Sequence, residues 1–188
     1  MTKLSGKTAI VLGVAPGNVG HAIARRYADD GATVLVAGRR PDALAEVADG
    51  IGAQWQPCDI TSEADLDALV ERARNLFGHI DVGVNATGGV CSPLSRTPPA
   101  RISSGWLRSS SPGFQFFQRL VANMPNGGSI IQISSVTASI MFENHAAYMA
   151  PRPASTMIRC IATNTGSAGS APLDRAGGVA TPRCRAVD

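Results

Sequence analysis

The segment TAIVLGVAPGNVGHAIARRYADDGATVLVAG (residues 8–38) decides the fold, because two short apolar runs flank a glycine-rich turn and a helical repeat. The runs TAIVLG (8–13) and TVLVAG (33–38) are apolar throughout, which is typical of strands buried on both faces of a parallel sheet. Between the runs, apolar residues recur at helical spacing: Val19, Ala22, Ile23 and Tyr27. The segment therefore predicts a strand, a helix whose inner stripe these four residues form, and a second strand.

The same alternation continues along the chain. Further strands are predicted at AQWQPCDI (53–60), IDVGVNA (80–86) and SIIQIS (129–134). The predicted helices between them carry the apolar residues Leu44, Val47, Ala48 and Ile51, then Leu66, Leu69, Val70, Ala73 and Phe77 behind a capping Ser62, and finally the segment FQFFQRLVANM (114–124). Strands and helices in this order predict an α/β fold, a doubly wound parallel sheet in three layers, α/β/α.

Two segments, 92–113 and 166–188, follow neither period and are predicted to be irregular parts of a single domain, 1–188. The first contains seven serines, four prolines and three arginines, and no acidic residue. Two explanations fit this contrast. The segments are out-of-frame translations of a GC-rich gene, or they have diverged together with the substrate side of the protein.

Composition excludes several classes of function. The net charge of +3 is too small to indicate a protein that binds the phosphate backbone of a nucleic acid. No apolar run reaches the ~18 residues that span a membrane. The first residues, MTKLSGKTAI, do not resemble a signal peptide, so we expect a cytoplasmic protein. We expect no metal site, since the cysteines lie far apart at positions 58, 91, 160 and 184 and the histidines are equally scattered.

Three glycines, Gly13, Gly17 and Gly20, lie between the first predicted strand and the first predicted helix. Glycines in this place let the backbone approach a pyrophosphate, which the free amides at the helix amino end then bind. Turns also collect glycine without any ligand. The position of the cluster between a buried strand and an amphipathic helix favours dinucleotide binding over a plain turn.

Five motifs carry a resemblance to a known family: the glycine turn, GRRPDAL (38–44), CDIT (58–61), VNATG (84–88), and ISSVTA (133–138) followed by Tyr148. With these motifs the chain resembles the classical short-chain dehydrogenases/reductases, which bind NAD or NADP on a Rossmann fold. The resemblance covers 4–91 and 114–150. It implies a Rossmann-like sheet that is incomplete at its C-terminal edge, because family chains continue with further strands.

The resemblance also implies roles for individual residues. The pyrophosphate would lie against Gly13, Gly17, Val19 and Gly20, the adenine between Asp59 and Ile60, and the inner ribose near Asn85 and Ala86. Arg39, followed by Arg40, would meet the adenosine ribose, and a guanidinium suits a 2′-phosphate. NADP is therefore the expected cofactor, with NAD as the alternative.

The implied catalytic residues are Ser135, Tyr148 and Arg152. In the family, the serine holds the substrate oxygen, the tyrosine transfers a proton, and a lysine four residues further on supplies a cation. Arg152 stands at the lysine position between two prolines, and the chain has no lysine after Lys7. Arginine supplies charge but keeps its proton, so it cannot relay one.

Three functions fit these observations. The resemblance implies an NADP-dependent oxidoreductase that acts on a small-molecule carbonyl or secondary alcohol, as a homodimer or homotetramer. Arg152 and its flanking prolines fit a module that binds the nucleotide or a partner without turnover. The irregular segments fit a gene product with no independent function.

Overall fold

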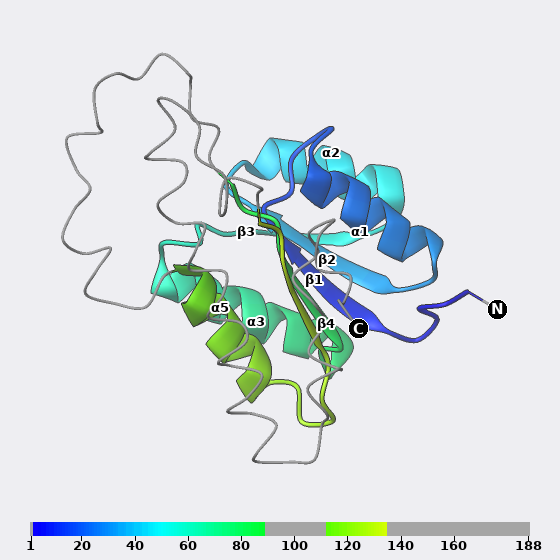
Figure 1. Ribbon diagram of the computed structural model, residues 1–188. Helices are drawn as coiled ribbons and strands as arrows, with labels where there is room; N and C mark the ends of the chain where they lie inside the picture. Colours follow the sequence, from blue (N-terminus) through cyan, green and yellow to red (C-terminus); the bar gives the residue numbers. More distant parts are fainter. Residues whose placement is uncertain (1, 89–111, 135–188) are drawn as a thin grey trace, which may run out of the picture.

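The computed structural model describes residues 2–88 and 112–134, which form five strands and four helices around one sheet (Figure 1). In chain order the elements are β1 (Thr8–Leu12), α1 (Val19–Asp29), β2 (Thr33–Gly38), α2 (Pro41–Ile51), β3 (Gln54–Pro57), α3 (Glu63–Phe77), β4 (Val82–Asn85), α5 (Pro112–Ala122) and β5 (Ser129–Gln132). Strands and helices alternate, as the sequence predicts.

The five strands form one sheet in the order β3-β2-β1-β4-β5, and every neighbouring pair is parallel. The order steps outward from β1 in both directions, which is the doubly wound, Rossmann-like arrangement that the sequence predicts. Because all strands run the same way, the loops that follow them meet at one edge of the sheet, the carboxyl edge. Ligands of such folds bind outside that edge.

Each face of the sheet has its own helical cover. In Figure 1, α1 and α2 lie on one side of the sheet, and α3 and α5 lie on the other. Successive side chains of β1 point to opposite faces, so Ile10 packs in one cluster with Leu66 of α3, and Val11 packs in another with Leu44 of α2. All five residues of β1 are therefore buried, which explains the continuous apolar run.

The predicted inner stripe of α1 is wrong in its first turn. The side chain of Val19 is 57% exposed and Ala22 is exposed, whereas Gly20 and Ala24 are buried. The other two residues of the predicted stripe are partly buried and pack against the cluster on this face. The reason is distance: a Cβ at Gly20 would lie 2.7 Å from the carbonyl oxygen of Gly13, so only small residues fit where α1 meets the turn.

The third strand is shorter than the predicted 53–60. β3 covers Gln54–Pro57, none of its four residues is fully buried, and it lies at the edge of the described sheet. Unlike β1 and β2, β3 is therefore not buried on both faces. A strand with a neighbour on one side only needs less apolar surface.

The helix before β5 begins at Pro112, two residues earlier than predicted, and ends at Ala122. Pro112 and Gly113 are thus helical rather than irregular. Proline fits the first turn of a helix, where its missing N–H has no intrahelical partner. The rest of the two predicted irregular segments lies outside the described residues.

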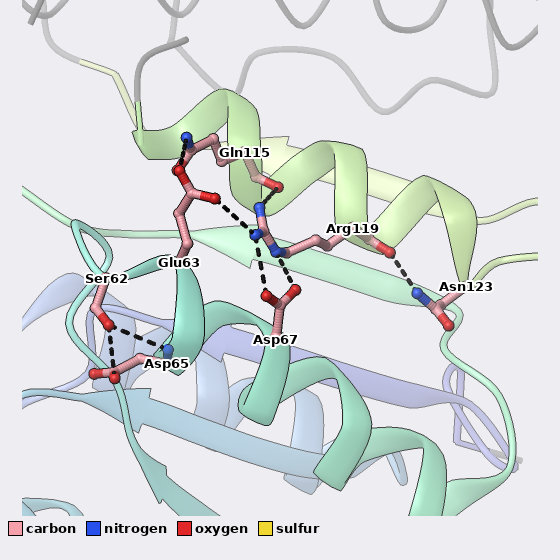
Figure 2. A network of polar contacts seen from close by, with 7 residues as sticks. All are labelled: Ser62, Glu63, Asp65, Asp67, Gln115, Arg119 and Asn123. Carbon is pink, nitrogen blue, oxygen red and sulfur yellow. Dashed lines mark hydrogen bonds and ion pairs between the residues drawn. The ribbon is translucent and has the colours of Figure 1, made fainter. Parts of the chain in front are cut away.

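Polar contacts join α5 to α3 on the surface of the molecule (Figure 2). Arg119 of α5 donates from Nε to Oδ1 of Asp67 at 2.6 Å, and its Nη2 lies 3.7 Å from a carboxylate oxygen of Glu63. Gln115 also donates to Glu63, at 3.1 Å. Ser62 caps α3 as predicted, because its Oγ accepts from the amide of Asp65. These contacts hold α5 in place beside β4 and β5.

Candidate functional site

The turn between β1 and α1 brings three backbone segments into close contact. Gly13 has φ +95°, and a Cβ there would lie 2.5 Å from the amide nitrogen of Thr87. A Cβ at Gly20 would lie 2.7 Å from the carbonyl oxygen of Gly13. Neither position has room for a side chain, so these two glycines are required by close approach. This is the packing of turn on helix that a dinucleotide-binding turn uses.

Asn18 is the N-cap of α1, and the sequence analysis missed it. Its Oδ1 accepts from the amides of His21 at 2.8 Å and Ala15 at 3.2 Å, and its Nδ2 donates to the carbonyl oxygen of Gly13 at 2.8 Å. Nδ1 of His21 in turn accepts from the amide of Gly17 at 3.1 Å. Asparagine directly before a helical stripe is a known signal for an N-cap and could have identified Asn18.

The amino end of α1 has the electrostatics of an anion site. The first amides of a helix have no intrahelical carbonyl partner, and the helix dipole gives this end partial positive charge. The first turn of α1 contains no acidic residue that would oppose an anion. This end of the helix therefore suits an anionic group.

The end of β2 excludes an acidic side chain at its last position. A Cβ at Gly38 would lie 2.7 Å from the carbonyl oxygen of Val14, so no residue larger than glycine fits there. Arg39 and Arg40 follow and are exposed. They line an open hollow of about 480 Å³ together with Pro16, Pro41, Asp42, Ala43 and Glu46. The hollow joins the glycine turn to the start of α2 and carries two guanidinium groups and two carboxylates.

The loop after β3 places Asp59 near this hollow. Oδ1 of Asp59 accepts from the amide and the hydroxyl of Thr61, at 2.9 and 2.8 Å. These bonds, and then the charge of Arg39, hold the pKa of Asp59 below its usual range. The amide of Asp59 donates to Asp65, and the side chain of Ile60 packs against the α3–α5 core. The loop is therefore ordered, with its carboxylate ionised.

Hydrogen bonds of two side-chain amides, those of Asn85 and Gln132, connect the end of β4 to β5. Asn85 is only 3% exposed, and its Oδ1 accepts from the amide and the hydroxyl of Thr87, at 3.0 and 2.7 Å. Its Nδ2 donates to Oε1 of Gln132 on β5 at 2.8 Å. Thr87 and Gln132 were both missed by the sequence analysis. The signal for Gln132 was a lone amide at the carboxyl end of an apolar strand.

All nine predicted cofactor residues lie at the carboxyl edge of the sheet, in β4, in the loops that follow the first four strands, or in the first turn of α1: Gly13, Gly17, Val19, Gly20, Arg39, Asp59, Ile60, Asn85 and Ala86. Backbone bonds tie their loops together. The amide of Gly13 donates to Ala37 and the amide of Ala86 donates to Leu12, both at 2.8 Å. The predicted catalytic residues Ser135, Tyr148 and Arg152 lie outside the described residues.

Within residues 2–88 and 112–134, no group of three or more His, Cys, Asp and Glu side chains could hold a metal ion. Cys58 is buried as a free thiol, and burial, followed by the charges of Asp65 and Asp59, raises its pKa to about 12. Such a thiol is a packing residue rather than a nucleophile. In the same part of the chain, no helix is both long enough and apolar enough to cross a membrane.

A comparison with protein families supports the resemblance seen in the motifs. Residues 13–170 match the sequence profile of a group of short-chain dehydrogenases that is described as "Enoyl-(Acyl carrier protein) reductase". The match covers more than half of the chain. The chain belongs to the short-chain dehydrogenase/reductase family. The glycine turn, the parallel sheet and its strand order are the features through which this family membership is visible in the structure.

Two relatives show what share of a family protein's length this chain spans. A 3β-hydroxysteroid dehydrogenase of Mediterraneibacter gnavus is 30% identical over 165 residues, which are 82% of this chain and 58% of the relative. An uncharacterised oxidoreductase of Staphylococcus haemolyticus is 28% identical over 166 residues, which are 84% of this chain and 71% of the relative. The chain thus spans between about half and three quarters of the length of these two proteins.

Solved structures of the family agree with the fold. A hydroxysteroid dehydrogenase from Escherichia coli has a TM-score of 0.74 and 32% identity, and the match covers 88% of this chain and 69% of that one. A 7α-hydroxysteroid dehydrogenase complexed with NADH and 7-oxo glycochenodeoxycholic acid has a TM-score of 0.73 and 30% identity, covering 88% and 68%. An enoyl-(acyl-carrier-protein) reductase from Anaplasma phagocytophilum, at 20% identity, shows the fold alone.

Proposed function

We propose that this chain binds NADP(H) at its carboxyl edge and transfers hydride between that cofactor and a small carbonyl compound or secondary alcohol. The observation that carries the cofactor preference is the end of β2. Gly38 leaves no room for an acid that would accept a bond from a bare 2′-hydroxyl, and Arg39 follows it at the rim of the hollow. A 2′-phosphate would gain from the guanidinium. The similar 7α-hydroxysteroid dehydrogenase structure contains NADH, so the preference for NADP is proposed from the residues of this chain.

The residues present suit the diphosphate of a dinucleotide. Gly13 and Gly20 let the turn, the β4 loop and the amino end of α1 pack directly on one another, and the amino end of α1 would offer backbone amides to the diphosphate. Gly17 and Val19 complete the turn, with the side chain of Val19 exposed. The nicotinamide supplies the hydride acceptor or donor when the cofactor is bound. The chain's own part is to hold the diphosphate and to set the direction of the dinucleotide along the sheet edge.

The proton would be transferred by Tyr148, with Ser135 holding the substrate oxygen. A free phenol has a pKa of about 10, so a cation must favour its ionised form at neutral pH. Arg152 is the cation that the sequence offers four residues after Tyr148. The substrate class follows from the family, and the named relatives make hydroxysteroids a reasonable first panel of alcohols.

The cofactor proposal is tested by calorimetric titration of the full chain with NADPH and NADH. We expect Arg39→Ala to weaken NADPH binding roughly 10- to 100-fold, because a charge-assisted contact is lost, and to leave NADH binding within about twofold. Arg72→Ala is the matched control, since Arg72 is an exposed arginine on α3. Equal affinity of the unmodified chain for both cofactors, or equal weakening of both by Arg39→Ala, would refute the preference.

The second candidate function is nucleotide binding without turnover, and Arg152 favours it because arginine cannot relay a proton. Oxidation of NADPH with a panel of ketones, followed by absorbance, separates the two functions. Turnover supports the enzyme, and binding without turnover supports the second function. Under the first function, Arg152→Lys should raise the rate if the cation alone limits it.

A further inference from the structure

Two side-chain amides on neighbouring strands form a partly buried polar link at the carboxyl edge. Asn85 of β4 and Gln132 of β5 are register partners in the parallel ladder, so their side chains stand next to each other. Nδ2 of Asn85 donates to Oε1 of Gln132 at 2.8 Å. Nε2 of Gln132 donates to the carbonyl oxygen of Ile133 at 2.8 Å, and lies 3.4 Å from the carbonyl oxygen of Asn85.

These contacts leave the amide of Asn85 one orientation. Because Nε2 of Gln132 donates to carbonyl oxygens at the strand ends, Oε1 of Gln132 must face Asn85 as an acceptor. Nδ2 of Asn85 then faces Gln132, and Oδ1 points the other way and accepts the two bonds from Thr87. Turning either amide over would set donor against donor inside a site where Asn85 is 3% exposed.

The link ends at the glycine turn. The backbone amide of Thr87 is held by Asn85. Gly13 packs against the backbone of Ala86 and Thr87 so closely that a methyl group on Gly13 would not fit between them. A shift of Thr87 would therefore move or loosen Gly13. Since the carbonyl oxygen of Gly13 also accepts from Asn18, the N-cap of α1, the disturbance reaches the amino end of that helix.

We propose that Gln132 is a positioning residue for the dinucleotide: through Asn85 and Thr87 it holds the glycine turn in the shape that accepts a diphosphate. This role rests on the proposed function. It assigns to Gln132, which lies outside the glycine motif, control over cofactor affinity. It also makes Asn85 a positioning residue that connects Gln132 to Thr87, because Oδ1 of Asn85 accepts two hydrogen bonds from Thr87.

The test measures binding of two ligands to the full chain. NADPH needs the diphosphate site, whereas adenosine 2′-phosphate needs only the end of β2. We expect Gln132→Leu, which keeps the size and removes both amide functions, to weaken NADPH binding roughly tenfold and to leave adenosine 2′-phosphate within about twofold. Thr87→Val should also weaken NADPH binding, whereas Thr87→Ser, which keeps the hydroxyl, should bind NADPH as the unmodified chain does.

A second measurement keeps the role apart from general destabilisation. Amide hydrogen exchange by NMR, without any ligand, should be roughly tenfold faster at Thr87 and Gly13 in Gln132→Leu. The control is Asp81→Asn, which weakens a polar cluster at the opposite edge of the same sheet and should leave exchange at Gly13 and NADPH affinity unchanged.

The proposal is overturned if Gln132→Leu leaves exchange at Gly13 unchanged, or if it weakens both ligands to the same degree. It is also overturned if Asp81→Asn weakens NADPH as much as Gln132→Leu does. A chain that binds no NADPH at all would refute the proposed function, and the exchange measurement still decides in that case whether Gln132 orders the turn.

Discussion

The two edges of the sheet are built from different chemical groups. At the amino edge, where β1 and β4 begin, one carboxylate gathers its neighbours. Asp81 accepts from the amide and hydroxyl of Thr8 at 2.9 and 3.2 Å, and from Nζ of Lys7 at 2.9 Å. Nε2 of His79 lies 3.1 Å from the same carboxylate. The side chains of this edge satisfy one another.

Close approach of backbone segments occurs at one glycine of the amino edge, Gly128, whose Cβ would lie 2.6 Å from the carbonyl oxygen of Asp81, and at more positions of the carboxyl edge. Gly13, Gly20 and Gly38 each stand where a Cβ would meet main-chain atoms at 2.7 Å or less, so whole segments approach without side chains between them. Charged residues of both signs line the hollow here, Arg39 and Arg40 with Asp42 and Glu46. At the amino edge, side chains pair with one another, whereas at the carboxyl edge backbone segments pack directly on one another and charged side chains line an open hollow.

The largest effect should come from Gly13→Ala. Alanine at φ +95° with its Cβ 2.5 Å from the backbone of Thr87 must displace the β4 loop. Conformational strain and overpacking together should cost about 3 kcal/mol of the free energy of unfolding. NADPH binding should be lost as well, because the turn can no longer keep its shape. Urea denaturation and calorimetry measure the two effects.

Two outcomes would contradict this prediction for Gly13→Ala. If Gly13→Ala folds with its stability reduced by less than about 1 kcal/mol, the close approach at the carboxyl edge does not restrict the fold. If the variant is destabilised yet binds NADPH normally, the turn is a structural element only.

The second prediction concerns the amino edge and its pH dependence. Burial alone would raise the pKa of Asp81, but the hydrogen bonds from Lys7 and Thr8 outweigh it and hold the pKa below its usual value. A carboxylate whose pKa is lowered on folding stabilises the protein above its unfolded pKa of about 3.9, and this stabilisation is lost as the pH falls through the folded pKa. Asp81→Asn should cost about 1–2 kcal/mol at pH 7, discounted for the exposure of Lys7.

Denaturation curves of both proteins between pH 3 and pH 8 check this. We expect the difference in unfolding free energy between the unmodified chain and Asp81→Asn to be constant above about pH 5 and to shrink below about pH 4. A difference that stays unchanged down to pH 3 would show that the ionised carboxylate does not stabilise this edge.

Sequence reasoning succeeded where a signal is local. The bounds of β2 and the cap of α3 by Ser62 were predicted correctly, because an apolar run and a capping residue act within a few positions. The parallel, doubly wound sheet was predicted from the alternation of strands and helices, whereas the strand order comes from the structure. Glycine positions were also informative, since a buried strand and an amphipathic helix flank them.

Sequence reasoning failed where the structure depends on pairs that are distant in the chain. Asn85 and Gln132 are 47 positions apart and meet only because β4 and β5 are in register. Asp81 reaches Thr8 across 73 positions in the same way. The first turn of α1 was assigned the wrong face because Gly20 is buried by closeness to the turn, and hydrophobicity carries no information about distance.

The smallest effect should come from a matched pair of glycines, Gly6 before β1 and Gly17 before α1. Both have φ +74°, and for both a Cβ would meet nothing within 4 Å. Gly6→Ala and Gly17→Ala should therefore each cost about 1 kcal/mol of stability, from backbone strain alone. Their stabilities should be equal, and only their positions differ.

Binding separates them. A Cβ at Gly17 would meet no protein atom within 4 Å. Under the proposed function the diphosphate lies in this space, so a methyl group at Gly17 should weaken the binding of NADPH roughly tenfold. Gly6→Ala should leave NADPH binding unchanged, since Gly6 lies before the start of β1, away from the carboxyl edge. Because the strain is the same in both variants, a loss of affinity in Gly17→Ala alone assigns that loss to the ligand site. Equal affinities in the two variants would mean that the opening above Gly17 is only solvent and that the diphosphate lies elsewhere.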